Sequence, residues 1–248
     1  MSEKKIKLSV KNLSKSFGDL LVLDDISFDV AEGEFLCVVG PTGCGKTTFL
    51  NSVTKLYQPS SGEIFLNGEP VDLKKHNVSY IFQEQSNMEW LNVEQNVGFG
   101  LDIKGIKGKE KKDAVDEVLE MVGLSDYRKY YPNEISASML QRVVIARAFA
   151  TKPELLLMDE PYGQLDIELR YKLEDELIKL WKKTNTTIIF ITHNIEEAVY
   201  MSENILVLTN KPAKIKDKIA NNLDRPRRVS DRDFIKLRNH VTELIKWW

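Results

Sequence analysis

A glycine-rich segment that follows an apolar run constrains this chain more than any other feature. Residues 40–47 read Gly-Pro-Thr-Gly-Cys-Gly-Lys-Thr, which fits the pattern G-x-x-x-x-G-K-[S/T]. Residues 35–39 form a continuous apolar run, typical of a strand buried on both faces, and residues 47–56 are expected to form a helix. A strand, a glycine-rich loop and a helix in this order predict an α/β fold whose loop binds phosphate groups.

The backbone of this loop is as important as its side chains. Its glycines let N–H groups close around phosphate oxygens, and the helix that begins near Lys46 adds the positive end of its dipole. We expect Lys46 to reach the β- and γ-phosphates of a nucleoside triphosphate and Thr47 to place its hydroxyl on magnesium. The predicted nucleotide contacts are Gly40, Pro41, Thr42, Gly43, Cys44, Gly45, Lys46, Thr47 and Thr48. The loop alone does not distinguish a kinase, a GTPase and a transport ATPase.

Two carboxylates follow a second apolar run. Residues 155–160 read Leu-Leu-Leu-Met-Asp-Glu, and ligands of open α/β sheets bind at the carboxyl ends of such strands. We expect Asp159 to hold magnesium, directly or through water, and Glu160 to act as general base toward the attacking water. This pair favours hydrolysis over phosphoryl transfer to a substrate.

Composition narrows the class of protein. The chain has 248 residues, 42% of them hydrophobic, and a formal net charge of -2, so no basic excess favours a nucleic-acid partner and we predict none. No signal peptide is recognisable, and no apolar run approaches the roughly 20 residues that span a bilayer. The two cysteines, Cys37 and Cys44, are predicted to be small buried side chains in a reducing compartment, with a redox role for Cys44 as the alternative.

The rest of the chain alternates between strand and helix patterns. Helical spacing dominates residues 84–149, whereas short apolar strands and amphipathic helices alternate from residue 150 onward, which indicates a parallel sheet interrupted by a helical insert. The strands expected in the later part are 155–158, 187–191, 205–208 and 213–219; the expected helices are 109–122, 139–150, 167–183 and 195–201, with a short terminal helix that carries Trp247 and Trp248.

Several residues, taken together and in order, resemble the ATP-binding subunits of ABC transporters. Phe17 matches the aromatic residue that stacks on adenine, and Gln83 matches the glutamine that links magnesium and water to the membrane subunits. Residues 162–166 resemble the loop whose aspartate, here Asp166, crosses a dimer interface. His193 matches the switch histidine at the γ-phosphate, and Ser136 falls in the signature motif.

The resemblance implies a RecA-like P-loop core with an N-terminal antiparallel β subdomain and an inserted helical subdomain. Residues 1–83 and 150–222 would form the core, 84–149 the helical subdomain and 223–248 a tail. ATP and Mg2+ are the implied cofactors. The implied partners are permease subunits, bound through a groove near residues 87–93, a second ATPase subunit, and an extracytoplasmic substrate-binding protein. The chain would lie at the cytoplasmic face of the membrane, and it looks most like the nitrate, sulfonate and taurine importer group.

The signature motif departs from the family pattern. The family reads L-S-G-G-Q, whereas residues 135–139 read Ile-Ser-Ala-Ser-Met. The family uses this motif to bind the γ-phosphate held by the opposite subunit, so Ser136, Ala137, Ser138 and Asp166 are the predicted contacts with a partner's site. Side chains on Ala137 and Ser138 are expected to crowd the approach of backbone to phosphate. A heterodimer with one impaired site and a homodimer both remain open.

Two other classes of function compete with a transport role. A soluble ABC ATPase that acts on ribosomes or DNA usually carries two cassettes or a coiled-coil insert, and a basic face would be expected. A nucleotide kinase or GTPase would share the glycine-rich loop but would not need Gln83, His193 or the 162–166 loop.

Overall fold

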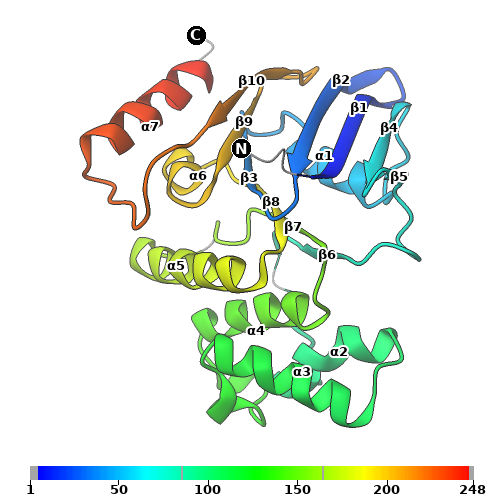
Figure 1. Cartoon of the computed structure of the whole chain (residues 1–248), viewed down its shortest axis with the longest axis vertical. Coiled ribbons are helices and arrows are strands. Elements are labelled where there is room, and N and C mark those ends of the chain that lie inside the picture. Colours follow the sequence, from blue (N-terminus) through cyan, green and yellow to red (C-terminus); the bar gives the residue numbers. More distant parts are fainter. Residues whose placement is uncertain (1–4, 85, 164, 246–248) are drawn as a thin grey trace. The chain divides into compact units, whose positions relative to one another are not determined.

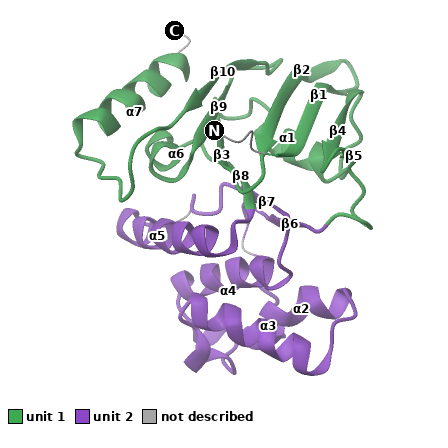
Figure 2. Cartoon of the chain, viewed as in Figure 1, with its two compact units in different colours: residues 1–76, 187–248 green, residues 77–186 purple. Residues whose placement is uncertain are grey.

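The computed structural model describes residues 5–84, 86–163 and 165–245, and the chain divides into two compact units. Unit 1 comprises residues 1–76 and 187–248, and unit 2 comprises residues 77–186 (Figure 2).

An antiparallel sheet forms the amino-terminal part of unit 1. Its strand order is β2 (Leu20–Ala31), β1 (Ile6–Phe17), β4 (Ser61–Leu66) and β5 (Glu69–Pro70) (Figure 1). Leu8, Val10 and Leu13 of β1 are buried, and the pairing with β2 changes register between Val10 and Leu13. This sheet is the antiparallel β subdomain that the sequence predicted.

A second sheet in unit 1 carries the glycine-rich loop. Its strands run in the order β10 (Ile215–Ala220), β9 (Asn204–Leu208), β3 (Phe35–Val39) and β8 (Thr187–Ile191). β3 pairs in parallel with both β8 and β9, and all five residues of β3 are buried, as its unbroken apolar run predicts. The helices of this unit are α1 (Lys46–Val53), α6 (Ile195–Met201) and α7 (Arg232–Ile245).

Unit 2 joins a strand pair to a group of helices. β6 (Val78–Ile81) pairs in parallel with β7 (Leu155–Asp159). The helices are α2 (Val93–Ile103), α3 (Gly108–Met121), α4 (Ala137–Ala150) and α5 (Ile167–Thr184), with 3-10 turns η1 (Ser125–Tyr127) and η2 (Pro132–Glu134). α2, α3 and α4 pack on one another around buried residues such as Val97, Leu119 and Val144.

Most predicted elements are confirmed, with three differences. Helix α2 was not predicted at all, and α1 ends at Val53 rather than Leu56, because Lys55 adopts a left-handed conformation (φ 56°) that a helix cannot continue through. The terminal helix α7 has 14 residues and is not short. Trp247 and Trp248 lie outside the described residues. Among the described helices, none is both long and apolar enough to cross a bilayer.

Candidate active site

The glycine-rich loop joins β3 to α1 in unit 1. Lys46 is only 5% exposed, and its Nζ donates to the carbonyl oxygens of Gly40 (3.0 Å) and Pro41 (3.2 Å). Thr47 is exposed in the first turn of α1, where no acidic side chain offsets the positive helix end. The loop therefore presents a buried lysine, an exposed hydroxyl and a helix N-terminus to an anion.

Gly45 is the cap residue of α1, and its backbone explains the glycine there. Its φ of 122° lies in a region that residues with a side chain avoid. A methyl group at this position would also lie 2.9 Å from Cγ1 of Val22 and 3.0 Å from Cδ2 of Leu23 on β2. The antiparallel sheet thus packs directly against the base of the loop.

Phe17 lies at the end of β1 and is 43% exposed. Its ring contacts Tyr57 edge to face, with the centroids 5.2 Å apart, and the Nζ of Lys15 lies 4.8 Å from its centroid. An exposed aromatic ring held in this way can stack on a nucleobase. Sequence reasoning missed both Tyr57 and Lys15. The signal for Lys15 was its position two residues before Phe17 in one strand, which places the two side chains on the same face, whereas nothing in the local sequence links Tyr57 to Phe17.

The thiol of Cys44 is buried within the loop. Cys37 and Cys44 are both buried, and burial raises the pKa of the Cys44 thiol. A buried thiol with a raised pKa is a poor nucleophile, so the structure favours the small buried side chain over the redox role.

His193 follows β8 and is exposed. β3 and β8 are parallel neighbours in which Val38 lies opposite Ile191, and the N–H of Thr192 donates to the carbonyl oxygen of Val38 at 3.2 Å. Because the glycine-rich loop leaves the same end of β3, unit 1 brings His193 and this loop to one edge of the sheet.

Unit 2 brings Gln83, Asp159 and Glu160 together in the same way. β6 and β7 are parallel, with Ile81 opposite Met158. Asp159 is the last residue of β7, and Gln83 and Glu160 come after the ends of β6 and β7, so all three lie at the carboxyl ends of neighbouring strands.

The two carboxylates differ in their surroundings. Asp159 is 3% exposed, and the hydroxyl of Tyr80 donates to its Oδ2 at 3.4 Å. Glu160 adopts a left-handed backbone conformation with φ 45°. Such a conformation is unusual for a residue other than glycine, and strain of this kind gathers at functional sites. Tyr80 was not predicted as a site residue.

The altered signature motif begins α4. Ser136 is the cap residue: its Oγ accepts from the N–H of Met139 at 3.4 Å and lies 2.9 Å from Oγ of Ser138. Ala137 is the first helical residue and is exposed. The helix N-terminus is therefore accessible to an anion, with a methyl group beside it.

Asp166 caps α5, and its Oδ1 accepts from the N–H of Leu169 at 2.9 Å. This bond gives Asp166 a structural role of its own. In the predicted 162–166 loop, Gln164 lies outside the described residues.

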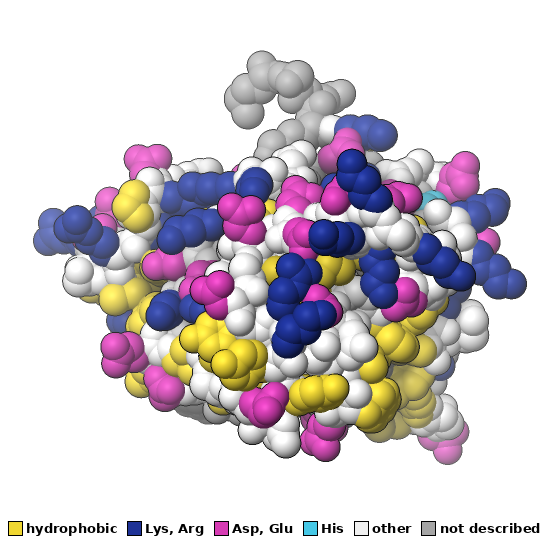
Figure 3. Space-filling view, turned by 90° about the horizontal axis from the view of Figure 1, so that it is seen from below, with side chains coloured by type: hydrophobic (Ala, Val, Ile, Leu, Met, Phe, Trp, Pro, Cys, Tyr) yellow, Lys and Arg dark blue, Asp and Glu magenta, His cyan; other side chains and the backbone are white. Residues whose placement is uncertain are grey.

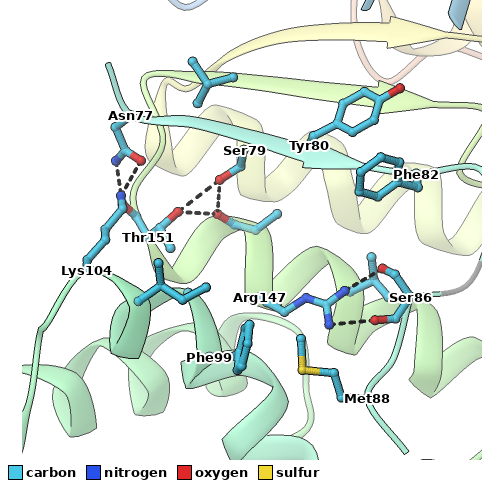
Figure 4. A pocket seen from close by; sticks show the side chains of 15 residues that line it. Asn77, Ser79, Tyr80, Phe82, Ser86, Met88, Phe99, Lys104, Arg147 and Thr151 are labelled. Carbon is cyan, nitrogen blue, oxygen red and sulfur yellow. Dashed lines mark hydrogen bonds between the residues drawn. The ribbon is translucent and has the colours of Figure 1, made fainter. Parts of the chain in front are cut away.

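Unit 2 also contains an apolar groove of about 450 Å3 (Figure 4). Tyr80 and Phe82 of the β6 segment line one side, and Met88, Phe99 and Ile103 contribute apolar groups from the α2 segment. The further lining residues are Asn77, Val78, Ser79, Ser86, Gly100, Lys104, Val144, Arg147, Ala148 and Thr151.

Two exposed side chains add apolar surface in this unit: Trp90 is 75% exposed and Ile103 is 73% exposed. Figure 3 shows hydrophobic side chains in patches among interspersed Lys, Arg, Asp and Glu; such patches often mark docking surfaces.

Two polar side chains hold the segment between β6 and α2, beside this groove, by hydrogen bonds. Arg147 of α4 donates to the carbonyl oxygen of Ser86 at 2.8 Å and to its Oγ at 2.6 Å. Asn96 of α2 is fully buried, and its Nδ2 donates to the carbonyl oxygens of Met88 (3.0 Å) and Leu91 (2.8 Å), while its Oδ1 accepts from the N–H of Met88 (2.9 Å). Asn96 therefore fixes residues 88–91. It was not predicted, because one asparagine inside a helix gives no local signal of such a role.

Comparison with known proteins decides the family. The model of the ABC transporter family matches residues 23–163. The chain belongs to the ABC transporter ATPase family. The ABC ATPase is 42% identical to an aliphatic sulfonates import ATP-binding protein of Bacillus thuringiensis subsp. konkukian over 233 residues, which cover 94% of this chain and 92% of the relative.

Solved structures agree with this family. CbiO1 of Clostridium perfringens, described as part of the ABC transporter complex cbiONQ, is 25% identical with a TM-score of 0.80, and the match covers 88% of the ABC ATPase and 89% of that chain. A dimeric post-hydrolysis state of the cassette MJ0796, bound to ADP and Pi, is 27% identical with a TM-score of 0.74, over 88% of the ABC ATPase and 100% of that chain. The fold is that of an ABC ATPase, and the activity of the family is ATP hydrolysis.

Proposed function

We propose that this ABC ATPase powers a membrane importer for a small anion or an organic sulfonate-like solute. The observation that carries this proposal is the 42% identity, over 94% of the chain, to an aliphatic sulfonates import ATP-binding protein. Import would further require permease subunits and an extracytoplasmic substrate-binding protein, with the ABC ATPase bound peripherally at the cytoplasmic face of the membrane.

We assign the groups that bind nucleotide to unit 1. The loop residues 40–48 hold the phosphates, Lys46 neutralises the β- and γ-phosphates, and Phe17 stacks on adenine. These roles fit a buried ammonium group, an uncompensated helix N-terminus and a half-exposed ring. His193, at the same sheet edge as the loop, contacts the γ-phosphate.

Each residue assigned to magnesium carries an oxygen donor of the kind that Mg2+ prefers. Thr47 in unit 1 offers a hydroxyl oxygen, and in unit 2 Asp159 offers a carboxylate and Gln83 an amide oxygen. When bound, the ion neutralises the phosphate charge that develops during hydrolysis. Glu160 accepts the proton of the attacking water, and Gln83 orients that water.

The apolar groove of unit 2 suits a short cytoplasmic helix of a permease. Its aromatic and aliphatic lining matches the apolar face of an amphipathic helix. Met88, within the predicted 87–93 segment, is one of the lining residues and is held by hydrogen bonds to Asn96. No nucleic-acid partner is part of this proposal.

We further propose that the ABC ATPase works beside a different ATPase subunit. The residues assigned to its own nucleotide match the family pattern. In the signature motif, which would contact the nucleotide of the partner subunit, Ala137 and Ser138 replace the two glycines of the family. Its Lys46 and Glu160 would then complete a competent site with the partner's signature motif.

Glu160→Gln tests the hydrolytic assignment. The amide cannot accept the proton of water, so we expect intact ATP binding, a nucleotide-trapped closed dimer and nearly abolished hydrolysis. Phosphate release and nucleotide binding would be measured on the same preparation. Glu120→Gln, at an exposed position of α3, is the matched control and should leave both unchanged. Ordinary hydrolysis by Glu160→Gln would refute the general-base role.

The importer assignment has its own test. The ABC ATPase should co-purify from membranes with a multi-span membrane protein, and the reconstituted complex should hydrolyse ATP faster with binding protein loaded with an alkanesulfonate. If the ABC ATPase instead co-purified with ribosomes or DNA, and no membrane protein accompanied it, the result would support the alternative of a soluble regulatory or mechanical ABC ATPase.

A further inference from the structure

The last turn of α6 is held by two arginines from the segment that follows β10. Arg227 is 7% exposed, and its Nη1 donates to the carbonyl oxygens of Val199 (2.8 Å) and Ser202 (2.7 Å). Arg225 donates to the carbonyl oxygen of Tyr200 at 3.2 Å. The last carbonyl groups of a helix have no partner within it, so these two guanidinium groups cap the carboxyl end of α6.

The first turn of α6 is held from α7, which packs beside it in unit 1 (Figure 1). Nη1 of Arg238 donates to Oε2 of Glu196 at 3.2 Å. Asn194 caps the same turn, and its Oδ1 accepts from the N–H of Glu196 at 3.0 Å. Residues near the carboxyl end of the described chain therefore hold both ends of a helix of seven residues.

His193 lies directly before this helix. On its amino-terminal side, Thr192 hydrogen-bonds through its hydroxyl to the side chain of Glu197, and its Oγ1 accepts from the N–H of Asn194 at 2.9 Å. The residues on both sides of His193 are thus bonded to α6, so a shift of α6 would displace the backbone of His193.

We propose that Arg225, Arg227 and Arg238 are positioning residues for His193 in ATP hydrolysis, and that they act through α6. The inference rests on the proposed contact of His193 with the γ-phosphate. A seven-residue helix is too short to be stable by itself in water. Its orientation is therefore set by the packing of its buried apolar residues Ala198, Val199 and Met201 and by the groups bonded to its two ends. Misplacing a catalytic group by about 1 Å can lower a rate by about 100-fold.

The burial of Arg227 supports a role in positioning α6 rather than a role in packing alone. Burial, together with the positive charge of Arg225, lowers the pKa of Arg227 to about 10, which leaves it charged at neutral pH. A buried charge is expensive unless it is fully hydrogen-bonded. Nη1 of Arg227 donates to carbonyl oxygens at the end of α6, while its Nε and Nη2 donate to those of Leu223 (3.1 Å) and Asn221 (3.3 Å) in the segment that follows β10. Arg227 therefore ties α6 to that segment in a way that an apolar side chain would not.

Arg238→Ala tests the proposal in the full chain, assembled with its transport partners. We expect kcat for ATP hydrolysis to fall by about 3- to 30-fold while KM for ATP changes by less than about twofold, since coupling through a positioned element has this magnitude. Lys236→Ala is the matched control: Lys236 lies on the same helix, is 68% exposed and pairs with Asp233 at 2.8 Å. It should leave kcat unchanged.

A double variant separates positioning from loss of structure. If Arg238 acts through His193, then adding Arg238→Ala to His193→Ala should lower kcat by less than about twofold. Equal losses in both backgrounds, an unchanged kcat in Arg238→Ala, or a rise in KM alone would each overturn the proposal. An unchanged kcat in His193→Ala would instead refute the role of His193 itself, so the two failures are distinct.

Histidine NMR gives a readout that does not depend on residual activity. The chain has three histidines, so their imidazole signals can be assigned with one substitution each. Arg227→Lys should move the His193 signal and leave that of His76 in place. His240 lies on α7 and is not used. A His193 signal that stays in place, or equal shifts of His193 and His76, would contradict positioning through α6.

Discussion

At the scale of single residues, Gly45 shows how the phosphate loop depends on backbone conformation. With φ at 122° and β2 at contact distance, this position accepts a side chain only if both the backbone and the neighbouring strand adjust. Lys46, the next residue, owes its direction toward the carbonyl oxygens of Gly40 and Pro41 to that conformation.

Gly45→Ala should therefore destabilise the nucleotide-free protein by about 1–3 kcal/mol and weaken ATP binding. Gly43→Ala is the control within the same loop: its φ is also positive, at 74°, but no atom lies within 4 Å of the added methyl group. We expect it to lose only about 1 kcal/mol. Denaturant unfolding without nucleotide measures both, and equal losses would show that the contact with Val22 and Leu23 adds nothing.

Residues with strong local signals were predictable, and residues that act across the fold were not. Lys46, Asp159 and Glu160 stand in short motifs that combine a buried strand with a turn. Tyr57 and Asn96 carry no such signal. Tyr57 lies in the segment between α1 and β4 and contacts Phe17 at the end of β1, and Asn96 reaches Met88 by a bend of the chain before α2.

At the scale of elements, Asn96 joins α2 to the segment that borders the apolar groove. Asn96→Leu has similar volume but cannot replace the bonds to Met88 and Leu91, so residues 88–91 should lose their fixed conformation. We expect weaker binding of the permease and about 1–3 kcal/mol lower stability, with little change in ATP affinity. Gln95→Leu is the control, because it makes the same change at an exposed position of the same helix. It removes the bond that Gln95 accepts from the N–H of Asn92 but leaves the bonds of Asn96 to Met88 and Leu91 in place. Unaltered permease binding by Asn96→Leu would contradict the role of this segment.

An ion cluster holds α2 and α3 to the chain that follows them. Nε of Arg128 donates to Oε2 of Glu94 at 2.8 Å, and Nη2 donates to Oδ1 of Asp116 at 2.6 Å. Burial acts to raise the pKa of Glu94, but hydrogen bonds from Lys129 and Arg128 outweigh it, so the pKa is lowered.

A lowered carboxylate pKa stabilises the folded state above the pKa of the unfolded chain, near 4.5, and this stability is lost as the pH falls through the folded value. Arg128→Ala should thus lower the free energy of unfolding by about 1 kcal/mol at pH 7 and by less at pH 4. Denaturant unfolding at the two pH values measures the difference. A loss that does not depend on pH would mean that Arg128 acts through packing rather than charge.

The pattern of apolar residues predicted most elements but missed α2. Residues 93–103 contain two glycines, which lower helix propensity and concealed the i, i+4, i+8 spacing of Val93, Val97 and Leu101. The structure forms the helix because Asn92 and Gln95 make a capping box and because Val97 and Leu101 are buried in the helical group. The cap and the buried face together outweigh the low propensity of the glycines.

At the scale of the whole molecule, the altered signature motif matters for the nucleotide site of a partner subunit, because the motif would contact the γ-phosphate bound there. Ser136 remains as the cap of α4, whereas Ala137 is exposed at the helix N-terminus that would face a partner's phosphate. A methyl group there keeps the backbone N–H groups from approaching an anion closely.

Restoring the family pattern with Ala137→Gly, Ser138→Gly and Met139→Gln should therefore repair the site that this chain completes for its partner. In the purified complex we expect two distinct ATPase chains, and a rise of about tenfold in turnover at the repaired site, which corresponds to about 1.4 kcal/mol of transition-state stabilisation. The two glycines should at the same time lower the stability of α4 by about 1 kcal/mol each. A gain in turnover could therefore not be attributed to higher stability. A complex with a single kind of ATPase chain, with ordinary turnover that the triple substitution leaves unchanged, would refute the asymmetric pair.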